Sequence, residues 1–163
     1  MACMETLTAY LRSNQVPFTV QTHQPAFTAR EVAASAHLPA LMIAKVVVVD
    51  ADAQPAMLVL PAAYRVDLSR VYELLGARLV RLADERELAM IFPDCAIGAM
   101  PPFGNLYGIP VYIDPMIAAQ PQIVFQPGSH TETMAISYAD YARLVRPHVA
   151  QVAGELHELA APA

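Results

Sequence analysis

The alternation of apolar and polar residues predicts both helices and strands along this chain. Apolar residues at helical spacing predict a helix over 6–13. The segment VPFTVQTH, residues 16–23, alternates as a strand does. Two aliphatic runs within 43–61 flank a polar turn around 50–55, which is the pattern of a β-hairpin.

Capping signals place three helices more closely. TARE, residues 28–31, is a capping box in which the Thr side chain bonds the third amide and the Glu side chain reaches back. Asp67 begins a helix that Gly76 ends, at a position where a left-handed residue is favoured. Asp84 and Glu87 open another short helix.

The second half of the chain continues the mixture. Strands are predicted at 77–82 and 109–114, and two more lie within 122–136 around a tight connection. Ser137 begins a last clear helix, and the tail 148–163 is predicted to be weakly helical. Strands and helices alternate irregularly, which favours a mixed α/β or α+β sheet over a doubly wound parallel one.

Length and composition indicate one domain without a membrane span. With 163 residues the chain can bury a single core, so we expect one domain over 1–163. Apolar residues make up 56% of it, yet no run reaches the roughly 18 uncharged apolar residues of a spanning helix. The start, MACMETLTAYLRS, lacks the basic region of a secretory signal. We therefore predict a cytoplasmic protein with no membrane partner.

The charge and the motifs exclude several classes of function. A formal net charge of −5 argues against a duplex-DNA binder, which needs an extended basic face, but a local patch is enough to hold one short nucleic-acid end. The absence of a GxGxxG motif and of a P-loop predicts no nucleotide cofactor. The five histidines have no His or Cys partner at ligand spacing, so no metal is predicted. Cys3 and Cys95 form no motif and are predicted to be reduced thiols.

Lys45 is the only lysine of the chain. It precedes a run of four valines at the start of a predicted strand, although lysine is seldom buried without a partner. Two interpretations stay open. The side chain either reaches from the strand end to water or holds its ammonium in a partly dry pocket as a point charge for an anionic ligand.

Two glycine-containing segments carry further candidates. GAMPPFG, residues 98–104, either presents amides to a carbonyl or phosphate oxygen or is a tight connection between elements. In GSHTE, residues 128–132, Ser129 and His130 are the residue types of a nucleophile and its base, but neighbours along a strand point to opposite faces. The alternative is a turn in which Gly128 supplies backbone freedom and Ser129 bonds locally.

Taken in order, these segments resemble the YbaK/ProX family, the freestanding relatives of the editing domain inserted in bacterial prolyl-tRNA synthetases. The resemblance runs from about residue 5 to 147, and it is carried by short stretches in series with ordinary spacings. The matching stretches are HQPAFTAREVA (23–33), IAKVVVV (43–49), LVLPAAYRVDLSRV (58–71), ARLVRLADERELAMIF (77–92), GAMPPFG (98–104), PVYID (110–114) and IVFQPGSHTE (123–132).

The resemblance implies an α+β fold, a twisted, mostly antiparallel sheet with helices packed around it. It also implies hydrolysis of the ester between a wrong amino acid and the 3′ adenosine of a tRNA. Water would attack with help from the substrate's own ribose hydroxyl, without a protein nucleophile or a metal. The implied partner is the 3′ end of an aminoacyl-tRNA, with a prolyl-tRNA synthetase as a second candidate. Alanine and cysteine on tRNA-Pro are the implied substrates.

The same resemblance assigns roles to single residues. Lys45 matches the family's lysine at the strand end and would hold phosphate near the terminal adenosine. Gly98 matches its loop glycine and would offer an amide to the ester carbonyl. His130 matches the histidine of the GSH turn and would help to shape the aminoacyl pocket. These three are the expected catalytic residues. The expected substrate-binding residues are Thr28, Phe103, Gly104, Gly128 and Ser129.

Two departures from the family pattern border the expected pocket. Gln126-Pro127 replaces the Asn-Ala or similar pair before the GSH turn, and the segment 39–42 lacks the Gly and acidic residue common there. They leave the edited amino acid open. The main alternative is a non-catalytic module that binds a small ligand or a protein on the same fold. A Ser-His esterase with Ser129 as its nucleophile is a third hypothesis.

Overall fold

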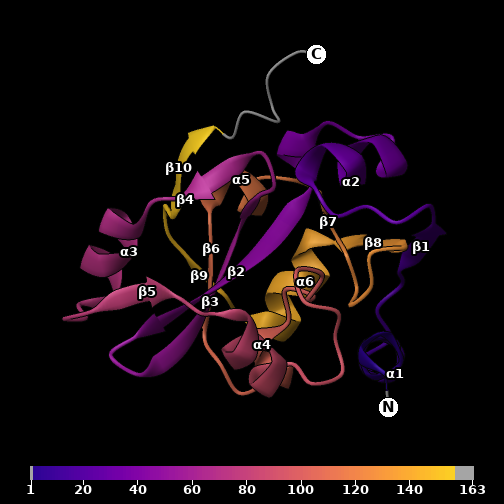
Figure 1. Ribbon diagram of the computed structural model, residues 1–163. Coiled ribbons are helices and arrows are strands. Elements are labelled where there is room, and N and C mark those ends of the chain that lie inside the picture. The colour runs from indigo at the N-terminus through magenta and orange to yellow at the C-terminus, as the bar shows by residue number, and fades with distance from the viewer. Residues whose placement is uncertain (1, 157–163) are drawn as a thin grey trace.

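The chain folds into twisted strands surrounded by helices, as the computed structural model shows for residues 2–156 (Figure 1). None of the helices described there is long and apolar enough to cross a bilayer. The helices are α1 (Cys3–Ser13), α2 (Ala29–Ala36), α3 (Leu68–Leu75), α4 (Glu85–Ile91), α5 (Pro115–Ala118) and α6 (Tyr138–Val145), with 3-10 turns η1 (Ala40–Met42) and η2 (Gly104–Leu106). The strands are β1 (Thr19–Thr22), β2 (Ala44–Ala51), β3 (Gln54–Pro61), β4 (Tyr64–Val66), β5 (Val80–Leu82), β6 (Val111–Ile113), β7 (Gln122–Phe125), β8 (Glu132–Ser137), β9 (His148–Val149) and β10 (Ala153–Leu156).

The largest sheet has five strands in the order β5-β2-β3-β6-β9. Its centre is the long antiparallel hairpin of β2 and β3, in which Lys45 pairs with Leu60. β5 joins β2 antiparallel, whereas β6 and β9 extend the other side in parallel. The hairpin predicted over 43–61 is confirmed.

A second sheet, β1-β8-β7, is antiparallel throughout. A parallel bridge between Ile43 and Val124 joins it to the start of β2, and β4 and β10 form a separate antiparallel pair. Five of the seven strand pairs are therefore antiparallel. The expected α+β fold with a mostly antiparallel sheet is confirmed.

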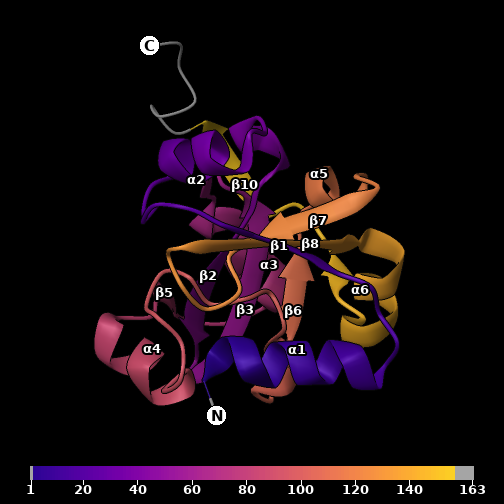
Figure 2. The same ribbon diagram turned by 90° about the vertical axis from the view of Figure 1, so that its right-hand side faces the viewer.

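Helices cover opposite ends of these sheets. In Figures 1 and 2, α2 lies at one end of the molecule and α1 and α4 at the other. The predicted caps hold the helix termini. Thr28 and Glu31 bond reciprocally at the start of α2, and Asp84 and Glu87 do so at the start of α4. Gly76 ends α3 in the left-handed conformation, with φ of 60°.

The largest apolar cluster lies between the five-stranded sheet and helices α1 and α6. Phe103 is completely buried in it, with its ring edge-to-face against Phe125 and Tyr141 at centroid distances of 5.6 and 5.3 Å. The Tyr141 hydroxyl donates to the carbonyl of Pro102 at 2.6 Å. These contacts anchor the Phe103 end of the 98–104 loop in the core, which restricts the position of its other end at Gly98.

The last part of the described chain is extended. The Asp114 carboxylate accepts the N–H groups of Val152 and Ala153 at 3.0 and 2.9 Å, which ties this segment between β9 and β10. The prediction of a helical tail is wrong for 148–156, because these residues complete sheet edges. Residues 157–163 lie outside the described part of the chain.

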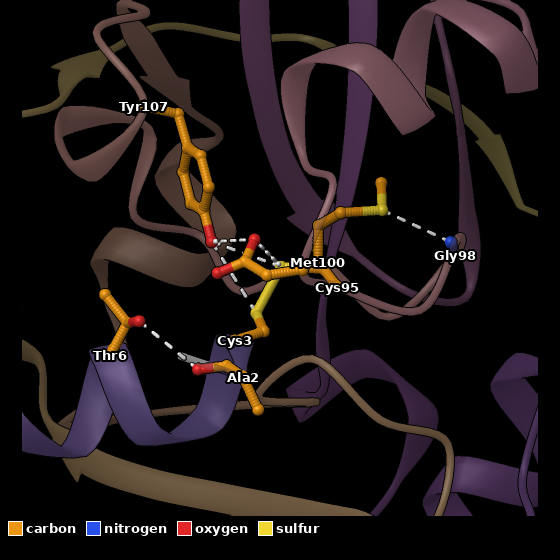
Figure 3. Close-up of a disulfide and its surroundings, with 8 residues drawn as sticks. Ala2, Cys3, Thr6, Cys95, Gly98, Met100 and Tyr107 are labelled. Carbon is orange, nitrogen blue, oxygen red and sulfur yellow. Dashed lines mark hydrogen bonds between the residues drawn. A yellow bond between two sulfur atoms is a disulfide. The ribbon is translucent and has the colours of Figure 1, made fainter.

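The two cysteines are bonded to each other (Figure 3). Cys3 begins α1 with an exposed fraction of 2%, and its N–H donates to the carbonyl of Asp94 at 3.1 Å. Its Cα lies 5.0 Å from that of Cys95, across a sequence separation of 92. The prediction of reduced thiols is therefore wrong. The pairing depends on α1 docking against the loop after α4, which no local pattern indicates.

Candidate functional site

A pocket of about 340 Å³ opens where five segments meet. They are the start of α2, the start of β2, the residue after β3, the loop after α4 and the connection after β7. Thr28, Lys45 and Gly98, far apart in the sequence, line this pocket together. Its volume lies at the lower end of the range for small-molecule sites, so it suits one small group better than a large ligand.

Lys45 is the second residue of β2 and is half-buried at the pocket. Burial lowers the pKa of its ammonium, and the Arg65 guanidinium nearby lowers this pKa further. None of the four ion pairs formed within residues 2–156 includes Lys45. The pocket therefore holds positive charge that those ion pairs leave uncompensated, which favours an anionic ligand over a side chain that merely extends to water.

Gly98 supplies a backbone amide to the pocket. Its φ of 88° lies in the left-handed region that favours glycine. Its N–H donates to the sulfur of Met100 at 3.2 Å, as the dashed line in Figure 3 marks. A thioether is a weak acceptor, so little hydrogen-bond energy is lost when a carbonyl oxygen replaces the sulfur as the partner of this N–H.

Thr28 caps α2 and still has a hydroxyl proton to donate. Its side-chain oxygen accepts the N–H of Glu31 at 3.1 Å, which caps α2. A hydroxyl that accepts one bond still carries an O–H donor. Thr28 can therefore donate to a polar group in the pocket while it holds the helix start in place.

His130 stands directly behind Gly98. Its Cε1 lies 3.5 Å from where a β-carbon on Gly98 would be, and its ring stacks on Phe27 at a centroid distance of 4.4 Å. Its Nδ1 lies 3.3 Å from the carbonyl oxygen of Ala26 and its Nε2 lies 3.0 Å from that of Ile97. His130 is not among the residues that line the pocket, but it supports Gly98 and Phe27, which are. Because both of its ring nitrogens face backbone acceptors, neither is positioned as a base for water.

Ser129 turns away from this arrangement. Its hydroxyl donates to the Glu132 carboxylate at 2.9 Å, and in the described chain no hydrogen bond joins it to His130. Gly128 before it has φ of 108°. The turn interpretation fits this geometry, and the nucleophile and base arrangement of an esterase does not.

Three other expected substrate-binding residues are not brought to the pocket. Phe103 is completely buried in the core. A β-carbon on Gly104 would lie 2.7 Å from the carbonyl oxygen of Ile109, and one on Gly128 would run into the sulfur of Cys3. These residues support the surrounding backbone, because the space at each is filled by the protein itself.

Beyond Thr28, Lys45 and Gly98, nine described residues line the pocket without having been assigned to it from the sequence, and three of these have polar or aromatic groups or contacts that matter to the site. Phe27 directly precedes the capping box, and an exposed aromatic at a helix entry was the available signal. Gln126 differs from the family pattern, but the sequence does not place it in the pocket. Its side-chain N–H donates to the carbonyl of Ala26 at 2.9 Å and so braces the wall that carries Phe27. Met100 gave no signal, since its role depends on the fold of the loop.

A family model for the aminoacyl-tRNA editing domain matches residues 23–144. The matched range contains Thr28, Lys45, Gly98 and His130. The chain belongs to this family. No protein with a curated description matches it.

Solved structures share the editing-domain fold. The hypothetical protein APE2540 superposes with a TM-score of 0.82 at 21% identity, over 91% of this chain and 99% of that one. A candidate trans-editing enzyme for prolyl tRNA synthetase gives 0.82 at 19% identity, over 95% and 99%. A scaffold protein for the presentation of linear epitopes gives 0.82 at 20%, over 96% and 99%. Likeness at these identities establishes the fold alone.

The positive charge around this editing-domain pocket comes from few residues. Arg70 and Arg81 are each paired with carboxylates. Arg65 lies close enough to Lys45 to lower the pKa of its ammonium. Lys45 is the one cationic side chain among the described residues that line the pocket, so the charge available to an anion there is centred on Lys45.

One group of metal-ligand residue types occurs within residues 2–156: Cys3, Asp94 and Cys95. Thiolates are the form of cysteine that binds metals, and here the two sulfurs are joined to each other. The group lies beside the start of α1, and none of its members lines the pocket.

Proposed function

We propose that this chain is a hydrolase that deacylates mischarged aminoacyl-tRNA in trans. One observation carries the proposal: in a member of the editing-domain family, Lys45 and Gly98 line the same pocket. The Lys45 ammonium takes part in none of the described ion pairs and suits a phosphate. Among the described residues, the Gly98 amide is bonded only to a thioether and suits an ester carbonyl.

Each residue has a distinct part in the proposed reaction. Lys45 holds the phosphate next to the terminal adenosine, and the Gly98 N–H polarises the ester carbonyl and then stabilises the oxyanion. Water adds to the carbonyl carbon while the substrate's free ribose hydroxyl takes part in the proton transfer. The bond from the carbonyl carbon to the ribose oxygen then breaks, and the proton passes to that oxygen.

The absence of a protein base in this scheme agrees with the position of His130. Its two ring nitrogens face the carbonyl oxygens of Ala26 and Ile97. An aminoacyl ester is already activated, so positioning and polarisation of its carbonyl suffice for useful acceleration. His130 contributes by fixing the wall beside Gly98.

The size of the pocket supports a small aminoacyl group. About 340 Å³ must hold the amino acid and part of the ribose. We propose alanine or cysteine esterified to tRNA-Pro as the substrate type and a prolyl-tRNA synthetase as a candidate partner, since its product is what such an enzyme would correct.

A deacylation panel tests the proposal. Purified protein is incubated with tRNA-Pro charged with alanine, cysteine or proline, and with tRNA-Ala charged with alanine as the matched control. We expect hydrolysis of at least one mischarged tRNA-Pro well above the uncatalysed rate and little hydrolysis of the correctly charged species. Binding without turnover on the whole panel would instead establish the non-catalytic module.

A further inference from the structure

Phe27 is an exposed aromatic residue at the mouth of the pocket. Its exposed fraction is 65%. Single exposed apolar side chains are ordinary on protein surfaces, so exposure alone carries no conclusion. Of the thirteen large apolar side chains exposed within the described residues, however, Phe27 is the one that lines this pocket.

The backbone under this ring is held in place. The N–H of Phe27 faces the Glu31 carboxylate at 3.4 Å. The preceding residue, Ala26, is completely buried, and its N–H donates to the carbonyl of His130 at 2.7 Å. The ring itself rests on the His130 imidazole, tilted by 36°. One side of the ring is therefore supported by protein, and most of the remainder is open to solvent.

Gly98 and Phe27 both line the pocket, and the imidazole of His130 lies behind them. It connects the two through the 3.5 Å and 4.4 Å contacts already described. In an aminoacylated 3′ end, the ester carbonyl, the ribose and the base follow one another. With the ester at Gly98, the base therefore reaches Phe27 on the other side of the ribose.

We propose that the exposed face of Phe27 is the platform on which the base of the terminal nucleotide stacks. This assignment rests on the proposed function and makes Phe27 a substrate-positioning residue. A flat base covers a flat ring whatever its hydrogen-bonding edge, so the contact holds the single-stranded end without reading a sequence. The base on Phe27 and the phosphate on Lys45 together fix the nucleotide on both sides of its ribose.

A fluorescent nucleotide tests the stacking directly. The probe is an uncharged RNA hairpin with a single-stranded CCA end in which 2-aminopurine replaces the terminal adenine, because stacking quenches the emission of this base. Wild-type protein should quench it. Phe27→Leu should bind the probe about tenfold more weakly and quench it little. Phe27→Tyr should bind and quench the probe as the wild type does. The matched control is Leu79→Ala, because Leu79 is exposed to 66% and does not line the pocket.

The kinetics separate stacking from support of His130. Stacking acts on ground and transition state alike, so Phe27→Leu should raise KM with kcat unchanged. A fall in kcat at unchanged KM would overturn the platform in favour of a role in holding His130. Absence of quenching by the wild-type protein would overturn it as well. If the protein quenches the probe but deacylates no charged tRNA, the platform is supported and the proposed function is refuted. If the protein deacylates and Phe27→Leu equals the wild type in binding and rate, the proposed function is supported and the platform is refuted.

Discussion

A β-carbon on Gly98 would stand 3.5 Å from Cε1 of His130, in ordinary contact with the imidazole and inside the pocket wall. The space therefore permits a methyl group, but the φ of 88° does not suit one. A left-handed backbone costs a residue with a β-carbon about 1–2 kcal/mol. Substitution at Gly98 thus acts through the conformation of the backbone.

We expect Gly98→Ala to fold, to lose about 1 kcal/mol of stability and to deacylate roughly 100-fold more slowly, because a backbone that relaxes from the positive φ turns the amide away from the ester carbonyl. Urea denaturation beside single-turnover deacylation measures both effects. Gly108→Ala is the matched control, because Gly108 also has a positive φ, 71°, and a β-carbon there would meet nothing within 4 Å. Equal activity of the two variants would remove Gly98 from the mechanism.

The bond between Cys3 and Cys95 predicts a redox-dependent stability. It closes a loop with a sequence separation of 92, and cross-links of this kind typically contribute about 2–4 kcal/mol by restricting the unfolded chain. We expect a strong reductant to lower the Tm by several degrees in the wild type and to have no effect on Cys95→Ser. Thiol titration of the unfolded, unreduced protein should find no free thiols. Two free thiols and a Tm indifferent to reductant would contradict the cross-link.

Much of the fold is predictable from the sequence because its signals are local. The capping boxes at Thr28 and Asp84 and the hairpin over 43–61 depend on residues within a few positions of one another. The disulfide and the extended segment 148–156 depend on contacts between distant parts of the chain. No period of apolar residues records such contacts.

The residues of the candidate site also differ in whether local sequence signals reveal them. Lys45 and Gly98 stood out by residue type and by their place in a motif, and the fold brings both to one pocket. Phe103 belongs to an equally suggestive motif, but the motif does not reveal which of its residues turns into the core. Met100 and Gln126 enter the site only through the fold of their loops. Their place could not be derived from one sequence.

We expect deacylation to survive chelation. The group Cys3, Asp94 and Cys95 is the one set of three potential ligands within residues 2–156, and its sulfurs are bonded to each other. Rates measured after dialysis against EDTA should equal those of the untreated protein. A loss of turnover that added Zn²⁺ restores would show that a metal takes part.

The pairing of Arg81 with Glu87 predicts an acid-sensitive contact. Hydrogen bonding to Arg81, at 2.6 Å, holds the pKa of Glu87 at about 2, against an ordinary 4.5. A depressed pKa means that this contribution to stability is present above pH 4.5 and is lost as the pH falls toward 2. In Arg81→Gln, an NMR titration should show the Glu87 pKa move back toward 4.5. An unchanged pKa would show that the bond is not formed in solution.

The burial of Lys45 beside Arg65 makes its charged form unfavourable in the folded protein. Both effects lower the pKa of the ammonium, so the folded protein binds this proton less tightly than the unfolded chain does. The cost is present at pH values below the folded-state pKa, and it is relieved as the pH rises through that pKa toward the ordinary 10.5. At neutral pH, the charge of Lys45 therefore opposes folding unless an anion binds to it.

Lys45→Met should accordingly leave the Tm unchanged or slightly raised while deacylation collapses, because an apolar side chain of similar length suits the start of β2 and cannot hold a phosphate. Lys45→Arg should restore little activity, since a planar guanidinium does not replace a compact ammonium in a confined pocket, and Arg65 already lies nearby. The Tm and the single-turnover rate of both variants are measured beside Arg65→Met, which removes a neighbouring charge and leaves Lys45 in place. Inorganic phosphate or AMP should raise the Tm of the wild type and not that of Lys45→Met. If Lys45→Met unfolds while its folded fraction still deacylates at the wild-type rate, the lysine supports the strand and not the substrate.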